Sequence, residues 1–219
     1  MHHLKRGPAP DCLANYQHGV HQWTNITPTC AERKQIRTAL ESMQGRRCAY
    51  CEGDLDVHGH GQHIEHFRQR GRYPQGTFDW ENLFWSCVRE NSCGKHKDKC
   101  EAYPPADLIK PDNEDPEHFF LFASNGTIAI RTATLTAQEQ HRAAKTLRIF
   151  NLDETHGPLR HMRQAHCAGY IQTGEELQTI ALTWPPEDWL PFLADELAQT
   201  SHLPFSTAIK HTLTPLTSV

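Results

Sequence analysis

The sequence predicts an α+β fold, and three observations support this. Two segments combine helical apolar spacing with the Thr-x-x-Glu pattern of a capped helix start. An Asn-Gly dipeptide lies between two β-prone runs, which is the strongest short-range signal of a hairpin. A third segment, residues 48–100, concentrates paired cysteines and histidines, which indicates a small module folded around a metal ion.

An arm and a helix are expected before the cysteine-rich segment. Residues 1–28 contain three prolines and few periodic apolar positions, so we expect an irregular arm, packed through Leu13, Tyr16 and Trp23. Thr29 and Glu32 then have the spacing of a capping box, and Gly45 is a plausible helix stop. Between them, one apolar face is formed by Ile36, Leu40 and Met43.

A hairpin and three helices are expected after the cysteine-rich segment. The hairpin pairs residues 119–122 with residues 128–130 across Asn125-Gly126. A helix should run from the capping box at Thr136 to about Phe150, and another over 159–171. Trp184-Pro185-Pro186 should break the helical structure. A last helix should follow and contain Trp189, Phe192, Leu193 and Leu197. The expected regions are therefore 1–47 (arm and helix), 48–103 (metal module) and 117–219 (hairpin and helical region).

The composition predicts a cytoplasmic protein with no membrane partner. No apolar run approaches the roughly 18 residues of a membrane helix. The N-terminal stretch MHHLKRGPAPDC is basic but lacks the apolar core of a secretory signal. In a reducing compartment, the eight cysteines are expected to bind metal rather than form disulfides.

Charge is distributed unevenly along the chain. Residues 1–100 contain 14 Lys and Arg against 11 Asp and Glu, whereas residues 101–219 contain 8 against 15. A basic front half suits a phosphate-binding site, attached to an acidic region that does not touch phosphate. A chance asymmetry is the alternative interpretation.

Four cysteines predict a structural zinc site. Cys48 and Cys51 form a knuckle of standard spacing, and Cys87 and Cys93 form a wider one whose loop must bulge. A site with four protein ligands is closed, so this zinc should fold the module and not catalyse a reaction. The alternatives for the fourth ligand are Cys100 and His96, and four reduced, buried thiols are the alternative to a metal site.

The stretch His63-Ile64-Glu65-His66 is the candidate reactive segment. On a strand, His63 and Glu65 share one face and His66 lies on the other, but at a strand end Glu65 and His66 can reach one small site. A hard cation such as Mg²⁺ binds carboxylate oxygen, and a neutral imidazole is a suitable base for water. Three arginines that could line a phosphate path follow at once: Arg68, Arg70 and Arg72.

The order of these parts resembles the HNH endonucleases. Here the order is Cys48-x-x-Cys51, Glu65-His66, Asn82-Leu83, Cys87, Cys93 and His96. The resemblance implies a ββα-metal module with zinc knuckles, in which two strands carry the acid and the base and a following helix supplies the second metal ligand. It covers residues 48–100 specifically.

The resemblance also implies a role for each residue. His66 would be the general base, and Asn82 would hold the connecting loop and orient His66. Glu65 and His96 would bind one catalytic divalent ion, Mg²⁺ or Mn²⁺. The implied phosphate-binding residues are Lys95 or Lys97, joined by Arg68 and Arg70.

Two departures from the HNH pattern affect the metal ligands. Glu65 stands where Asp is common, and its extra methylene shifts the carboxylate, so His63 could share or take over the metal role. The widened second knuckle leaves open whether His96 or another residue reaches the metal.

Further motifs resemble the PtuB-type HNH proteins of Septu anti-phage systems and retrons. They are MHHLKR at the start, HIEHFRQR, DWENL, CGKHK and the later hairpin. This likeness implies that the partner is a PtuA-type ATPase of the ABC/SMC-like kind. In a retron system, a reverse transcriptase and its RNA–DNA hybrid would be further partners. Residues 101–219 would then be a docking surface; the alternative is that they only complete the fold.

The sequence therefore favours an endonuclease that acts on DNA or on a structured RNA such as tRNA, as a defence effector released by its ATPase. The alternative is a non-catalytic zinc module that binds nucleic acid or protein. The set that distinguishes them is Glu65, His66, Asn82 and His96, because a binding module needs none of it.

Overall fold

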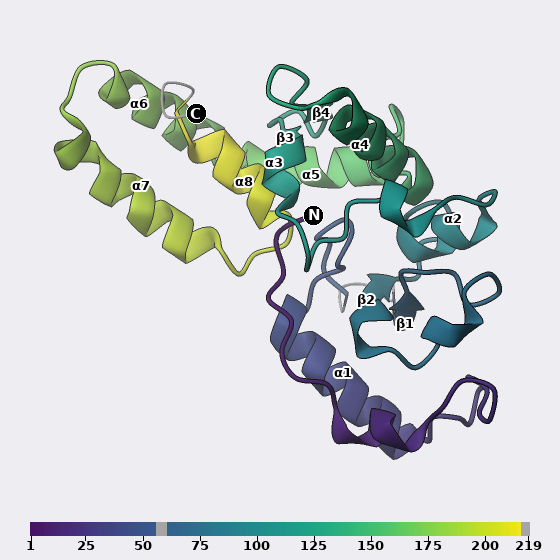
Figure 1. Cartoon of the computed structure of the whole chain (residues 1–219). Helices are drawn as coiled ribbons and strands as arrows, with labels where there is room; N and C mark the ends of the chain where they lie inside the picture. The colour runs from purple at the N-terminus through teal and green to yellow at the C-terminus, as the bar shows by residue number, and fades with distance from the viewer. Residues whose placement is uncertain (56–60, 216–219) are drawn as a thin grey trace.

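The computed structural model describes residues 1–55 and 61–215 and has the predicted α+β character (Figure 1). The strands form two antiparallel pairs, β1 (Gln62–His66) with β2 (Leu83–Cys87) and β3 (Phe120–Phe122) with β4 (Ile128–Ile130). The helices are α1 (Cys30–Gln44), α2 (Cys93–Lys99), α3 (Pro116–Phe119), α4 (Ala137–Phe150), α5 (Pro158–Ala168), α6 (Ile171–Ala181), α7 (Pro186–Thr200) and α8 (Ser206–Leu213).

The two helices predicted from capping boxes are confirmed. At the start of α1, the Thr29 hydroxyl accepts a hydrogen bond from the backbone N–H of Glu32, and the Glu32 carboxylate accepts one from the backbone N–H of Thr29. Thr136 and Glu139 do the same for α4, which ends at Phe150 as expected. These local bonds satisfy amide groups that a helix start otherwise leaves without partners.

Strands β1 and β2 and helix α2 follow one another as strand, strand and helix. In the antiparallel pair, Glu65 is opposite Phe84 and His66 is opposite Leu83. All five residues of β2 are buried, so this strand forms the inner layer between β1, α1 and α2. The order matches the one that the HNH resemblance implies.

The predicted hairpin is confirmed as β3 and β4. Gly126 lies in the left-handed region, with φ +85°, and a Cβ there would lie 2.1 Å from the carbonyl oxygen of Arg160. Glycine is therefore required both by the turn and by the close approach of α5.

The predicted helix over residues 159–171 was wrong in extent. Helix α5 ends at Ala168, and a separate helix α6 begins at Ile171 after Gly169 and Tyr170. The last predicted helix is confirmed as α7; within it Trp189 and Leu193 are buried and Phe192 is exposed. Helix α8 carried no prediction.

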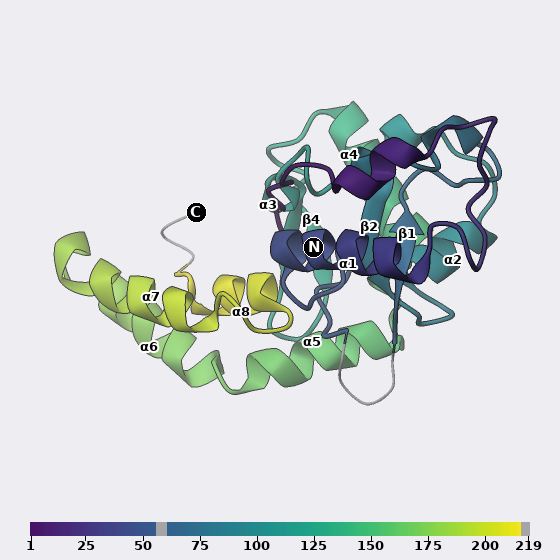
Figure 2. The ribbon, with the colours of Figure 1, turned by 90° about the horizontal axis from the view of Figure 1, so that it is seen from below.

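The C-terminal helices pack against the front half of the chain. Phe205 donates its backbone N–H to the carbonyl of Glu52, and Arg47 donates to the carbonyls of Ser201 and Leu203. One hydrophobic core includes residues from all three predicted regions, whose boundaries remain a prediction. Helices α6 and α7 extend away from the rest (Figures 1 and 2). Over the described ranges 1–55 and 61–215, no helix has both the length and the apolar character needed to cross a bilayer.

Candidate active site and metal centre

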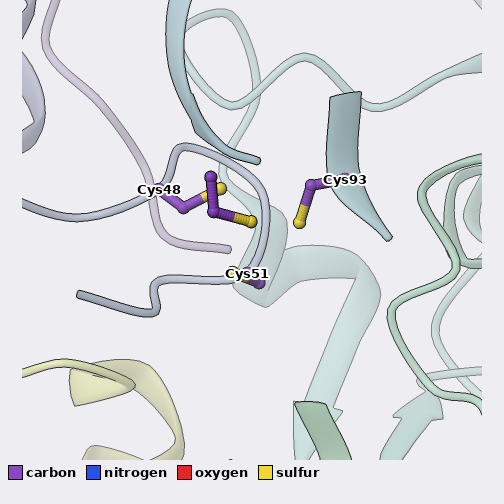
Figure 3. A group of neighbouring side chains, drawn as sticks. Cys48, Cys51 and Cys93 are labelled. Atoms are coloured by element: carbon purple, nitrogen blue, oxygen red, sulfur yellow. The ribbon is translucent and has the colours of Figure 1, made fainter. Parts of the chain in front are cut away.

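The four cysteines predicted to bind zinc converge at one point. Cys48 and Cys51 lie in the loop after α1, Cys87 ends β2 and Cys93 begins α2. All four are buried, and their sulfur atoms lie within 4.8 Å of one another. Figure 3 shows the labelled side chains of Cys48, Cys51 and Cys93 converging.

This donor set fits a thiophilic ion such as zinc. Zinc–sulfur bonds of about 2.3 Å in a tetrahedron place the sulfurs about 3.8 Å apart, close to the observed cluster. Burial raises the pKa of the Cys93 thiol, so a bound cation is what would favour the thiolate form. Cys93 adopts φ +54°, which shows how the widened knuckle bends to bring this residue into the cluster.

The alternative fourth ligands lie elsewhere. Nδ1 of His96 is 2.9 Å from the carbonyl oxygen of Ile149, on α4, and the Cys100 thiol also faces that carbonyl. Within the described part of the chain, the four cysteines are the one group of three or more potential ligands that is already assembled.

A buried glutamine joins the knuckle to the strands. At the end of α1, Gln44 donates to the carbonyl of Trp85 and accepts from its N–H, at 3.0 and 2.9 Å. Ala49 of the knuckle donates to the same carbonyl. No motif points to Gln44, because its partner lies 41 residues away.

His66 has the geometry of a neutral base. Its Nε2 lies 3.0 Å from the carbonyl oxygen of Thr77, so Nε2 carries the proton and Nδ1 is left as an acceptor. Burial lowers the pKa of His66 to about 4, which keeps the ring neutral at pH 7. The ring of Trp23, in the N-terminal arm, meets the imidazole edge-on at 4.7 Å and covers it. His66 is only 5% exposed.

Asn82 holds the loop that presents Thr77 to His66. Its Oδ1 accepts from the Arg68 N–H at 2.7 Å, and its Nδ2 donates to the carbonyl of Gly76 at 2.8 Å. Because Gly76 precedes Thr77, these bonds fix the carbonyl that accepts the hydrogen bond from Nε2 of His66. Asn82 is buried, so these bonds are not exposed to competition from bulk water.

Glu65 is buried and paired with His63 and Lys97. Its Oε2 accepts from Nε2 of His63 at 3.0 Å, and its Oε1 lies 2.7 Å from the ammonium of Lys97. Burial alone would raise the pKa of Glu65, but Lys97 and His63 hold it below its usual value. The Lys97 ammonium also donates to Asp98, a residue that the sequence did not single out.

Two predicted roles disagree with this arrangement. His96 is turned toward Ile149 and does not complete a three-ligand group with His63 and Glu65. Lys97 has a fully buried side chain, paired with Glu65, whereas a phosphate-binding lysine must face the substrate. His96 and Lys97 are consecutive residues of α2, so their side chains point in directions about 100° apart around the helix axis.

Of the two predicted arginines, Arg70 contacts the residue that covers His66, whereas Arg68 does not. Arg68 pairs with Asp79 at 2.6 Å, and Arg70 donates to the carbonyl of Trp23 at 3.1 Å. Arg70 therefore anchors the segment that covers the imidazole. Lys95 is half-buried on the first turn of α2.

The chain is similar in sequence to two curated proteins. It is 32% identical over 125 residues to Septu protein PtuB of Bacillus thuringiensis, an alignment covering 56% of this chain and 47% of that protein. It is 26% identical over 144 residues to the Retron Vc95 putative HNH endonuclease of Vibrio cholerae serotype O1 biovar El Tor, covering 64% and 67%. The chain spans about half the length of the first relative. No protein-family model matches it.

These similarities confirm the predicted resemblance to the HNH endonucleases. Within that class, the resemblance is to the PtuB-type proteins of Septu systems and retrons.

Proposed function

We propose that this chain is an HNH endonuclease that hydrolyses phosphodiester bonds of DNA or of a structured RNA such as tRNA. The observation that carries the proposal is the state of His66: neutral, with Nε2 bound to Thr77 and Nδ1 available. Nδ1 would take the proton of the water that attacks phosphorus, while the bond from phosphorus to the leaving sugar oxygen breaks and that oxygen takes a proton from solvent. The Thr77 carbonyl would stabilise the imidazolium that results, and Asn82 would hold that carbonyl in place.

The two kinds of metal have separate places in this proposal. The cysteine cluster would hold zinc, which has no open coordination position there and so folds the module. Of the predicted ligands of a catalytic Mg²⁺ or Mn²⁺, His63 and Glu65 are in contact, whereas His96 is turned toward Ile149 and does not join them. We therefore assign no step to a divalent ion held by that set.

The protonation of His66 makes the proposal testable by pH. The base form should persist from pH 8 to about pH 5, because the pKa of His66 is lowered to about 4. Single-turnover cleavage rates should stay flat over this range and fall only below it. Trp23→Ala exposes the ring and should move the midpoint up toward the usual value of about 6.5. A wild-type midpoint near 6.5 would contradict a buried base.

The partner in this proposal is a PtuA-type ATPase, with a retron reverse transcriptase and its RNA–DNA hybrid as the further candidate. The names of the relatives, a Septu protein and a retron-associated protein, support this. Residues 171–200, which form α6 and α7, contain six Asp and Glu and no Lys, Arg or His. Their exposed apolar residues are Ile171, Leu182, Trp184, Leu190 and Phe192. We propose this helix pair as the docking surface.

Point substitutions on α6 and α7 should weaken partner binding. Trp184→Ser with Phe192→Ser removes exposed apolar area, so the fold should be unaffected while co-purification with the ATPase falls by about tenfold or more. Ile26→Ser, an exposed apolar residue of the N-terminal arm, is the matched control. Equal co-purification of the double variant and the control would place the partner surface elsewhere.

The alternative function is a zinc module that binds nucleic acid or protein without cleaving it. The nuclease and the binding module are distinguished by incubating the purified protein and its partner ATPase with plasmid and total RNA, in the presence of Mg²⁺ or Mn²⁺. The nuclease proposal expects new nucleic-acid ends. Retention of intact nucleic acid in a gel shift, without cleavage under activating conditions, would favour the binding module.

A further inference from the structure

A hollow of about 350 Å³ opens beside His66, between the N-terminal arm and the loop that follows β1. Two of its lining residues also contact the imidazole: Trp23 meets it edge-on at 4.7 Å, and the Thr77 carbonyl accepts the hydrogen bond from Nε2. The reaction proposed above uses His66 and Thr77 but gives the hollow no role. A ligand seated there would lie within one side chain of the proposed base.

We propose that this hollow binds one unpaired base of a nucleic-acid strand, and that Arg33, Arg37 and Arg70 bind phosphates of the same strand. The inference rests on the proposed nuclease function and deepens it, because it names the substrate class. That class is a single-stranded segment, of DNA or of RNA, rather than a continuous duplex.

The lining of the hollow suits a nucleic-acid base. Trp23 is half-buried, and its indole offers an aromatic surface on which any base can stack. Nδ1 of His21 accepts the Gln17 N–H at 3.1 Å, so Nε2 of the neutral ring carries a proton that it can donate. Gln22 is exposed and adds an amide donor and acceptor. Proteins recognise unpaired bases by this combination of stacking and hydrogen bonds to the base edges.

The walls of the hollow are held by hydrogen bonds within the chain. On the arm, the Gln17 carbonyl accepts the N–H of His21 at 2.9 Å and closes a tight loop. Gly19 lies in this loop with φ +85°, a conformation that favours glycine. On the opposite side, Arg70 donates to the Trp23 carbonyl at 3.1 Å. A site formed in advance binds its ligand at a lower cost in conformational entropy.

Uncompensated positive charge lies next to this hollow. Arg33 donates to the Pro28 carbonyl of the arm at 2.8 Å, and Arg37 follows one turn later on the exposed side of α1. Burial lowers the pKa of Arg33, and the charges of Arg37 and Arg70 lower it further, so these guanidinium groups repel one another. None of the three forms an ion pair with a carboxylate of the described residues. A phosphate chain would supply the missing negative charge.

The arginines and the hollow form one continuous surface. The guanidinium carbon of Arg33 lies 5.2 Å from the ring centroid of Trp23, and Arg70 lines the hollow itself. Within residues 1–55 and 61–215, Arg33 donates through Nε and Nη2 and Arg70 through Nη1. A guanidinium has five N–H donors, so both side chains can bind phosphate without releasing the arm. A strand with one base on Trp23 therefore has its phosphates within reach of the arginines.

The test measures binding by the full, zinc-loaded chain and not cleavage. Fluorescence anisotropy follows labelled oligonucleotides without added Mg²⁺ or Mn²⁺, and gels confirm afterwards that the strands are intact. The ligands are oligo-dT, oligo-U, an abasic deoxyribose-phosphate strand of the same length, and a continuous dA·dT duplex. Oligo-dT and the abasic strand differ only in their bases, whereas oligo-dT and oligo-U distinguish DNA from RNA.

The expected dependence on the base is carried by Trp23. Wild type should bind oligo-dT or oligo-U at least about tenfold more tightly than the abasic strand, because one base stacks on the indole. Trp23→Ala should lose this preference but bind the abasic strand and the duplex like the wild type. Trp23→Phe keeps an aromatic ring and should keep most of the preference. Trp184→Ala, which removes an exposed tryptophan outside the arm, should match wild type.

The expected dependence on salt is carried by the arginines. Arg37→Gln removes one phosphate contact, so the slope of log affinity against log salt should become shallower by about 0.7 for a single strand. Oligo-dT and the abasic strand should be affected alike, because both contain the phosphates. The matched control is Arg148→Gln, since Arg148 is an exposed arginine of α4 that is paired with Glu101.

Three outcomes would overturn the inference. They are equal wild-type affinity for the base-containing and abasic strands, a Trp23→Ala variant that weakens both kinds of strand by the same factor, and an unchanged salt slope in Arg37→Gln. A failure of the nuclease proposal is distinguishable from these outcomes. It would leave the base-dependent binding intact but produce no nucleic-acid ends with the partner ATPase and a divalent ion.

Discussion

Cys48→Ser is expected to lose the bound zinc and most of the soluble, folded protein. All four cysteines are buried, and the knuckle between Cys48 and Gly53 packs on Phe205 of the C-terminal region. A structural zinc contributes about 10–16 kcal/mol in small metal modules, as much as the whole stability of an ordinary domain. Zinc per chain by mass spectrometry and the melting temperature measure this loss.

The matched control is Cys30→Ser. Cys30 is exposed at the start of α1 and lies outside the cluster, so this variant should keep its zinc and its melting temperature. If Cys48→Ser also melted and bound zinc like the wild type, the four thiols would not be a structural metal site.

Asn82→Ala is expected to reduce both stability and cleavage. It leaves the Arg68 N–H and the Gly76 carbonyl without their partners, at a cost of about 1–3 kcal/mol for each buried group. It also frees the loop that fixes Thr77 opposite His66. A misplacement of about 1 Å at a catalytic group can lower the rate by about a hundredfold. Urea unfolding and single-turnover rates measure the two effects.

Asn91→Ala serves as the control for this variant, since Asn91 is exposed in the loop before α2. It should unfold and cleave like the wild type. A wild-type cleavage rate in Asn82→Ala would show that the loop does not orient His66, even if stability fell.

The parts of the fold that could be predicted are those set by neighbouring residues. The capping boxes of α1 and α4 and the Asn-Gly turn of the hairpin act within four residues. The break between α5 and α6 was missed, because Gly169 in a helical pattern is compatible with either a continuous or an interrupted helix.

The cysteine cluster could be predicted from spacing, but the orientation of α2 could not. The bent, widened knuckle at Cys93 sets the rotation of that helix about its axis. A shift of one residue, about 100°, decides whether His96 or Lys97 faces Glu65. The structure turns Lys97 inward, where its ammonium pairs with Glu65 and Asp98.

Contacts between residues that are far apart in the sequence could also not be predicted. Trp23 covers His66 from the N-terminal arm, and Gln44 binds β2 across 41 residues. Neither residue belongs to a motif, and only the packed fold brings each to its partner.

The central claim, that this chain is a hydrolase whose base is His66, is tested most directly by one comparison. Wild type and His66→Ala, matched for zinc content and melting temperature, are incubated with the partner ATPase, divalent ion, plasmid and total RNA, and new ends are counted by sequencing. Loss of the base should lower the rate by about 10²–10⁴-fold, with zinc unchanged. Equal cleavage by both proteins, or none by either, would contradict the claim.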